Sequence, residues 1–185
     1  MQITTKKTAI EGVSICTSPQ FADERGSFSR WYCFESLKQL TKGLSIRQVN
    51  RSCNHLVGTV RGLHYQLSEQ PEYKIVRCIQ GQAMDFVVDL RRGSKTFLQH
   101  INIVLSNELN NAIVIPPGCA HGFQTMQKDT ELMYFHTGDY SAEHEYGVRF
   151  DDPLLNIMLP MPITQLSDRD KSFPFLSKHF EGLEL

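Results

Sequence analysis

The sequence predicts an all-β protein, a sandwich or barrel with a few short helices at its periphery. Most of its apolar segments are only as long as a strand and are rich in Val, Ile, Phe and Tyr, which fit a pleated sheet. Gly, Pro, Asn or Asp stand between these segments, as residues of tight turns do. Many short strands at close spacing are typical of sandwiches and barrels.

The predicted strands follow one another along most of the chain. They are the segments 12–16, 26–34, 58–66, 73–81, 83–90, 97–106, 111–118, 121–126 and 131–140. A jelly roll built from such strands closes its sheet edges and leaves a cavity that alternate side chains line. Polar residues that seem misplaced within a strand would gather in that cavity.

Helical periodicity is convincing in two places. The segment 34–40 ("FESLKQL") predicts a short helix, and the segment 164–183 predicts a C-terminal helical region. Ser167 is its candidate N-cap, acidic residues occupy its first turn, and Pro174 limits its first helical piece. We find no internal repeat, low-complexity tract or long linker, so residues 1–185 are predicted to form a single domain.

Composition and charge exclude several classes of protein. The formal net charge is -1 and there is no basic run, which argues against a nucleic-acid-binding protein. The first residues lack the apolar core of a signal peptide, and no segment is long enough to span a bilayer. The five cysteines are scattered without a CxxC pair, which argues against a disulfide framework or zinc ribbon. We therefore expect a cytoplasmic protein that contacts neither membranes nor nucleic acids.

A histidine and an arginine interrupt the predicted strand that contains "RGLHYQ". Successive side chains of a strand point to opposite faces, so His64 and Gln66 share one face and Arg61 takes the other. Gly62 lies between Arg61 and His64, and a glycine inside a strand often marks a bulge that redirects its neighbours. With such a bulge, Arg61 and His64 would face the same cavity.

Two further strands carry polar side chains on faces that are otherwise apolar. The same alternation places Lys74 with Val76, and Tyr134 with Leu132 and His136. Each residue has an ordinary structural explanation when it is taken alone. His64 could be a hydrogen-bonded core residue, Lys74 a lysine whose stem lies along the surface, and Tyr134 a half-buried aromatic.

A metal site is a competing interpretation of the same residues. The cavity of a small barrel can hold a metal between histidines on neighbouring strands. The candidate ligands are His55, His64, Glu69 and His121. No HxH pair occurs, because the residue two positions after His64 is Gln66. Ligand spacing is what makes a metal motif specific, so the sequence favours the absence of a metal.

Several stretches, taken in order, resemble the dTDP-4-dehydrorhamnose 3,5-epimerase family of nucleotide-deoxysugar epimerases. The most distinctive are "RGLHYQ" and "PPGCAHGF", and the others are "FADERGSF", "QVNRS", "YKIVRCIQGQAMDFVVDLRRGSKTF", "YFHTGDYSAEHEYGVRFDDP" and "LSDRD". Together they cover nearly the whole chain. The resemblance implies a cupin-type jelly roll that uses no metal or other cofactor and is usually a homodimer.

The resemblance also implies roles for individual residues. His64 matches the catalytic base, and Asp170 matches the carboxylate paired with it. Tyr134 matches the acid across the sugar ring, and Lys74 matches the lysine near the keto oxygen. The positions that match substrate-binding residues are Arg25 and Arg61 at the diphosphate, His121 near the sugar, and Phe28, Gln48, Asn50 and Tyr140 around nucleotide and sugar. In the family, the segment that corresponds to Phe21–Phe28 completes the partner subunit's site.

The implied reaction is inversion at C3 and C5 of a nucleotide-linked 4-keto-6-deoxyhexose, of the type that converts dTDP-4-dehydro-6-deoxyglucose to dTDP-4-dehydrorhamnose. The C4 ketone acidifies the hydrogens at both carbons, and imidazole titrates near neutral pH. His64 would remove a proton from one face, Tyr134 would return one to the other, and Lys74 would stabilise the enolate oxygen. Arginines suit the anionic diphosphate.

Other functions remain open on the sequence alone. The closest rivals are an epimerase that acts at C3 or C5 only and a ketoisomerase for another nucleotide sugar. Rivals from other classes are a metal-dependent cupin enzyme and a non-catalytic cupin that binds sugar nucleotides. The chain also departs from the usual family pattern at Arg30 and Val49, towards the nucleotide side or the scaffold. The nucleotide base and the sugar therefore stay open.

Overall fold

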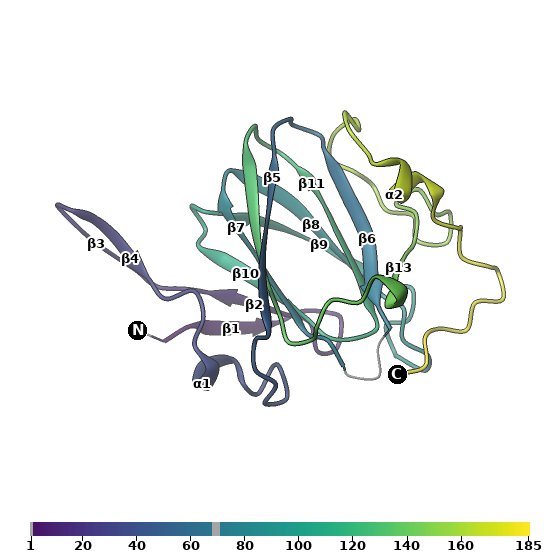
Figure 1. Ribbon diagram of the computed structural model, residues 1–185, viewed down its shortest axis with the longest axis horizontal. Coiled ribbons are helices and arrows are strands. Elements are labelled where there is room, and N and C mark those ends of the chain that lie inside the picture. Colours follow the sequence, from purple (N-terminus) through teal and green to yellow (C-terminus); the bar gives the residue numbers. More distant parts are fainter. Residues whose placement is uncertain (1, 68–70) are drawn as a thin grey trace.

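The computed structural model describes residues 2–67 and 71–185, and these residues form an all-β jelly roll, as predicted. Two antiparallel sheets face each other (Figure 1). The six-stranded sheet has the order β1 (Thr4–Lys7), β2 (Ser14–Thr17), β10 (Asn111–Ile115), β7 (Lys74–Gln80), β12 (Thr130–His136) and β5 (Gln48–Asn54). The five-stranded sheet has the order β13 (Glu145–Gly147), β6 (Val60–Gln66), β11 (Cys119–Thr125), β8 (Gln82–Asp89) and β9 (His100–Ser106).

An apolar core lies between the two sheets. Its buried members come from facing strands of both sheets and include Val76, Val87, Ile113, Phe123 and Leu132. The C-terminal segment covers the outer face of the five-stranded sheet with apolar side chains such as Ile157, Leu166 and Leu183. Both faces of that sheet are thus covered, which explains why all seven residues of β11 and six of the eight residues of β8 are buried.

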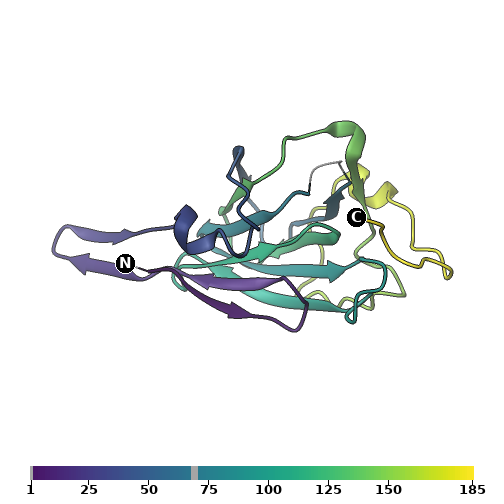
Figure 2. The ribbon, with the colours of Figure 1, turned by 90° about the horizontal axis from the view of Figure 1, so that it is seen from below.

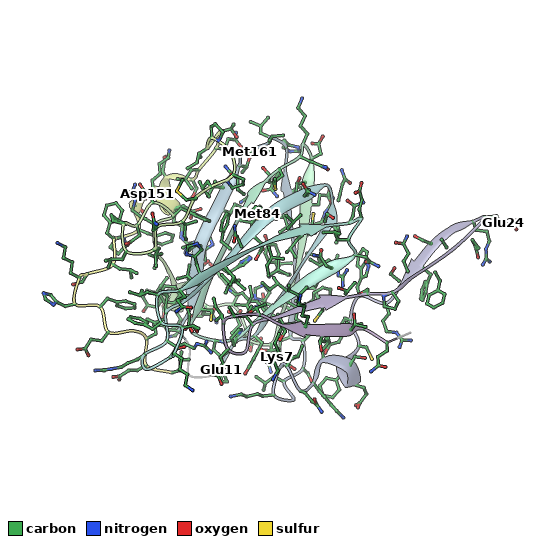
Figure 3. The ribbon with its side chains drawn as sticks, turned by 180° about the vertical axis from the view of Figure 1, so that it is seen from behind. Lys7, Glu11, Glu24, Met84, Asp151 and Met161 are labelled. Carbon is green, nitrogen blue, oxygen red and sulfur yellow. The ribbon has the colours of Figure 1, made fainter. Side chains whose placement is uncertain are left out.

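A two-stranded hairpin projects from this body. It consists of β3 (Gln20–Asp23) and β4 (Gly26–Ser29), and both ribbon views show it extending away from the two sheets (Figures 1 and 2). Figure 3 places Glu24 at its far tip. Phe21 and Phe28 lie opposite each other on the hairpin and are 58% and 64% exposed. Exposed aromatic side chains of this size commonly mark a contact surface.

The short helices differ in part from the prediction. Helix α1 (Phe34–Leu37) lies in the predicted segment, but the strand predicted over 26–34 already ends at Ser29. The predicted C-terminal helical region is wrong beyond helix α2 (Asp168–Ser172), because the rest of that segment is an irregular chain that packs on the sheet. The N-cap prediction is confirmed, since the hydroxyl of Ser167 accepts a hydrogen bond from the Asp170 backbone N–H at 3.0 Å.

Several elements were not predicted at all. Strands β1, β3, β5 and β13 are short or polar, and the strand β5 reads "QVNRSCN" with mostly exposed side chains. A 3-10 helix, η1 (Ala142–His144), precedes β13. Edge strands bury few side chains, so their sequences carry little of the apolar signal that prediction uses. Within the described ranges, no helix is long and apolar enough to cross a membrane.

The bulge predicted at Gly62 is present. His64 pairs with His121 and Arg61 pairs with Phe123, so four residues of β6 lie opposite three of β11. Gly62 has φ +111°, and a Cβ atom there would stand 2.6 Å from the Cα atom of Gly122. Only glycine fits this conformation and this close approach. The bulge turns Arg61 and His64 towards one cleft of about 590 Å³, where Asp170 and Lys171 also lie.

Candidate active site

His64 on β6 and Asp170 on α2 form a hydrogen-bonded pair across 106 residues of sequence. The Nε2 atom of His64 lies 2.8 Å from Oδ1 of Asp170, and the Gly62 N–H donates to the other carboxylate oxygen at 3.1 Å. The Asp170 side chain is 5% exposed and that of His64 is 28% exposed. A carboxylate only accepts, so Nε2 carries the proton of the neutral ring and Nδ1 keeps a free lone pair. Nδ1 is therefore the ring atom of His64 that is able to accept a proton.

The surroundings of Asp170 keep its carboxyl group ionised. Burial on its own would raise the pKa of Asp170, but the hydrogen bond and charge of His64 act the other way. The Gly62 N–H and the Ser167 hydroxyl act in the same direction as His64, and together they hold the pKa below its ordinary value. An ionised partner stabilises the imidazolium that forms when His64 takes up a proton.

A second imidazole–carboxylate pair lies beside the first. His121 is directly opposite His64 in the β6–β11 register, and its Nε2 atom is 2.7 Å from Oδ2 of Asp85. Asp85 was not predicted as a site residue, although a carboxylate inside the apolar run "AMDFVVDL" is a signal for it. Burial raises the pKa of Asp85 and outweighs the opposing effect of His121. Its Oδ1 atom has no hydrogen-bond partner among the described residues.

Tyr134 lies on the facing sheet, because β12 belongs to the six-stranded sheet and β6 to the five-stranded sheet. Its ring meets that of His121 edge to face, with centroids 6.4 Å apart. Its hydroxyl lies 3.1 Å from the hydroxyl of Ser52. Burial raises the pKa of Tyr134 far above its ordinary value. The phenol therefore holds its proton at neutral pH and has one to donate.

Lys74 lies on the same sheet, directly opposite His136 in the β7–β12 register. Its Nζ atom is 3.6 Å from Oε2 of Glu72, whose Oε1 atom lies 2.8 Å from Nδ1 of His136. Burial would raise the pKa of Glu72, but the hydrogen bond of His136 and the charge of Lys74 outweigh it and lower the pKa. No feature of the sequence marked Glu72 as a site residue. The side chains of Lys74, Glu72 and His136 form a compact cluster, and the ring of His136 stacks on that of Tyr134 with centroids 6.2 Å apart.

The remaining predicted residues of β5 and β6 lie near the residues described above, on the two different sheets. Gln48 and Asn50 pair with His136 and Tyr134 in the sheet register, and the Asn50 amide donates to the Gln48 carbonyl oxygen at 3.1 Å. The Gln48 amide donates to the Gly138 backbone carbonyl at 2.9 Å. Arg61 donates from Nε to Oδ1 of Asn54 at 2.7 Å. Its terminal guanidinium nitrogens keep donors for an anion.

Three predicted site residues do not join the others within one chain. Tyr140 is 63% exposed, and its hydroxyl donates to Oε2 of Glu145 at 3.2 Å. Arg25 and Phe28 belong to the projecting hairpin, which extends away from the two sheets (Figure 1). Arg25 is paired there with Asp23 at 2.6 Å. A single chain thus brings the predicted residues of the two sheets and of helix α2 near one another, but not those of the hairpin.

The residues considered as metal ligands do not gather in one place. His55 is exposed and lies 3.2 Å from Asp129, while His64 and His121 each contact a carboxylate of their own. Glu69 lies outside the described residues. Over residues 2–67 and 71–185, no three His, Cys, Asp or Glu side chains are placed to hold a metal ion.

Comparison with known proteins identifies relatives over most of the chain. The model of the family "dTDP-4-dehydrorhamnose 3,5-epimerase" matches residues 7–178. A protein of that name from Sinorhizobium fredii is 38% identical over 169 residues, which cover 91% of this chain and 87% of the relative. A dTDP-4-dehydrorhamnose 3-epimerase from Streptomyces niveus is 34% identical over 170 residues, covering 91% of this chain and 82% of the relative.

A solved structure extends the similarity to the backbone. It is that of dTDP-6-deoxy-D-glucose-3,5-epimerase from Legionella pneumophila, in complex with dTDP-4-keto-L-rhamnose. The match has a TM-score of 0.88 at 32% identity, and it covers 94% of this chain and 93% of that chain. The similarity thus includes the fold that carries the cavity as well as the sequence.

Proposed function

The chain belongs to the dTDP-4-dehydrorhamnose 3,5-epimerase family, and we propose that it inverts C3 and C5 of a dTDP-linked 4-keto-6-deoxyhexose. It is an isomerase of the epimerase class. The supporting observation is that a histidine with a buried carboxylate partner and a protonated phenol lie on the two facing sheets, with His121 between them in contact with the phenol ring. That is the arrangement that inversion of a carbon by proton transfer requires.

Each inversion begins with removal of a proton next to the C4 ketone. Nδ1 of His64 takes the proton, and the electron pair of the C–H bond becomes the enolate, with negative charge on the C4 oxygen. Asp170 stabilises the imidazolium. The Lys74 ammonium stabilises the enolate oxygen. Since the proton is only removed and returned, the reaction needs no redox partner.

Return of a proton from the other face completes the inversion. Tyr134 donates its hydroxyl proton to the carbon and becomes a phenolate for a short time. The imidazolium then loses its proton to solvent and the phenolate regains one, so both groups are restored. The second carbon follows by the same steps. We assign the diphosphate to Arg61, which lines the same cleft as His64, and part of the sugar to His121, which is opposite His64 in the sheet register.

We propose that the active form is a homodimer in which the hairpin of β3 and β4 completes the partner's site. The observation in support is the exposure of Phe21 and Phe28 on a hairpin that projects from the body. Arg25 at the hairpin turn would then add a second cation at the diphosphate. We also place the enzyme in the cytoplasm, since all five cysteines are unpaired.

A mono-epimerase is the second candidate, because the Streptomyces niveus relative is named for inversion at C3 only. The two functions are separated by incubation with dTDP-4-keto-6-deoxyglucose in heavy water and NMR analysis of the product. We expect deuterium at both C3 and C5, with inversion at both. Label at a single carbon would establish a mono-epimerase instead, and no label at all would contradict catalysis of this type.

A further inference from the structure

A chain of hydrogen bonds connects the guanidinium group of Arg61 to the hydroxyl of Tyr134. Arg61 Nε donates to Oδ1 of Asn54 at 2.7 Å. Nδ2 of Asn54 donates to the Ser52 hydroxyl oxygen at 3.4 Å, and that oxygen lies 3.1 Å from the Tyr134 hydroxyl. The two linking residues lie on β5, and neither contributes to the steps described above. Asn54 is 3% exposed, so the chain runs through the protein interior.

The direction of this chain is set at the Asn54 amide. A guanidinium group only donates, so Oδ1 must be the atom that faces Arg61. On the other side, Nδ2 also donates to the backbone carbonyl of Thr130 at 3.0 Å, and a carbonyl only accepts. Both neighbours therefore require the same orientation of the amide. Ser52 then accepts from Asn54, and its own single proton is left for Tyr134.

The direction of these hydrogen bonds determines where the hydroxyl proton of Tyr134 points. If Ser52 donates to the Tyr134 oxygen, the proton of Tyr134 is free to point into the cavity. When Tyr134 has given up that proton, the same Ser52 donor stabilises the phenolate, and the charge of Arg61 lies at the far end of the chain. The Ser52 hydroxyl and the charge of Arg61 both favour the ionised form of Tyr134, in opposition to burial.

We propose that Ser52 and Asn54 are positioning residues that direct the proton of Tyr134 towards the substrate and couple its acidity to the diphosphate-binding Arg61. This inference rests on the proposed function. It distinguishes removal of the proton from its return to the opposite face, because only the return depends on the hydrogen bonds through Ser52 and Asn54. Removal of the proton by His64, and its return to the original face, does not involve Ser52.

The test is Ser52→Ala, assayed in heavy water with the full-length protein and dTDP-4-keto-6-deoxyglucose. Loss of one hydrogen bond to a charged group should slow inversion by about 10- to 100-fold. Exchange that retains configuration, measured as deuterium in recovered substrate, should fall much less, so the ratio of exchange to inversion should rise. Ser52→Thr keeps the hydroxyl and should keep the wild-type ratio.

A second variant removes the donor from position 54 to Ser52 but keeps an acceptor for the guanidinium group of Arg61. In Asn54→Asp the carboxylate still accepts from Arg61 but cannot donate to Ser52, so Ser52 turns its proton towards position 54. The ratio of exchange to inversion should rise here too. Cys53→Ala lies on the same strand with its side chain exposed on the other face, and it serves as the matched control.

An equal loss of exchange and inversion in Ser52→Ala, or no loss of either, would overturn the inference, because a purely structural role changes both together. Failure of the proposed function looks different. In that case the wild-type protein itself shows neither exchange nor inversion, and the inference falls with it.

Discussion

In the proposed reaction, hydrogen bonds at single atoms determine which group acts as base and which as acid. The carboxylate of Asp170 occupies Nε2 of His64 and leaves Nδ1 as the basic atom. Both carboxylates are buried and each contacts a histidine, yet the pKa of Asp170 is lowered and that of Asp85 is raised. Contacts with several donors explain the first, and nearly complete burial explains the second.

Replacing Asp170 by asparagine should abolish the basicity of His64 at Nδ1 while keeping a side chain of the same size at position 170. The Gly62 N–H donates only, so the amide oxygen of Asp170→Asn turns to Gly62 and its NH₂ group faces Nε2 of His64. The imidazole then accepts at Nε2 and holds its proton at Nδ1. We expect kcat to fall by at least about 100-fold, as when a catalytic histidine is held in the wrong tautomer.

The measurement is turnover of the 4-keto substrate, with thermal unfolding as the check on folding. Asp168→Asn is the matched control, because it lies on the same helix and its side chain is 100% exposed. Turnover of Asp170→Asn close to that of the control would show that Asp170 does not set the tautomer.

The sequence predicted individual site residues where a motif or an interrupted strand marked them. His64, Lys74 and Tyr134 stand out on strand faces. His64 lines the cleft beside Asp170, and Lys74 and Tyr134 share one face of the other sheet. Asp85 and Glu72 were missed because their partners, His121 and His136, are distant in sequence and meet them only through the pairing of neighbouring strands. Arg25 and Phe28 were predicted only through the resemblance, and a single chain leaves them apart from the cavity.

At the scale of elements, the bulge in β6 brings Arg61 and His64 to the same cleft. The sequence predicted it because Gly62 separates two polar residues that strict alternation would place on opposite faces. The polar edge strand β5 could not be predicted in the same way, although it carries Gln48, Asn50 and Ser52. Apolar patterning identifies strands by what they bury, and β5 buries little.

Gly62→Ala should destabilise the protein more than a simple backbone penalty does. The comparison is Gly43→Ala, since Gly43 also has a positive φ, +78°, but has nothing within 4 Å of the new Cβ atom. Gly43→Ala should cost about 1–2 kcal/mol of unfolding free energy. Gly62→Ala should cost clearly more, because its Cβ atom would meet the Gly122 Cα and the His121 carbonyl oxygen at 2.6 Å each.

Urea unfolding of the two variants and the wild type measures both costs. Equal losses of stability in Gly62→Ala and Gly43→Ala would contradict the close approach of β6 and β11 at the bulge.

The end of β8 should make the stability of the fold dependent on acid pH. Asp89 is fully buried, and burial would raise its pKa, but hydrogen bonds from Arg91, Ser94 and Thr96 outweigh it and lower the pKa to about 2. A lowered pKa stabilises the folded state above the unfolded-state pKa, and this contribution disappears as the pH falls through the folded-state pKa. The stability gap between wild type and Asp89→Asn should be full above about pH 4 and close towards about pH 2.

Urea unfolding across this range gives the gap at each pH. A gap that stays constant as the pH falls would show that the ionisation of Asp89 contributes nothing to the fold.

At the scale of the whole molecule, the projecting hairpin predicts that two chains share each site. Arg25→Ala and His64→Ala should each be nearly inactive alone. In a mixed dimer, one site combines His64 of one chain with the intact Arg25 of the other, while the second site lacks both. Random mixing should therefore recover about a quarter of the wild-type activity, since about half of the dimers are mixed and half of their sites are intact.

The measurement is turnover after the two variants are unfolded together and refolded, and refolding each variant alone is the control. Recovery no greater than the sum of the two variants would contradict a site built from two chains.

Inversion by His64 and Tyr134 requires the sugar to lie between these two residues, with one residue at each face. A crystal structure of Tyr134→Phe with bound dTDP-4-keto-6-deoxyglucose tests it directly, because this variant cannot return the proton. We predict C3 or C5 at about 3–3.5 Å from Nδ1 of His64, with the ring at position 134 across the sugar. A sugar bound outside the cavity, or with both side chains on one face, would contradict the account.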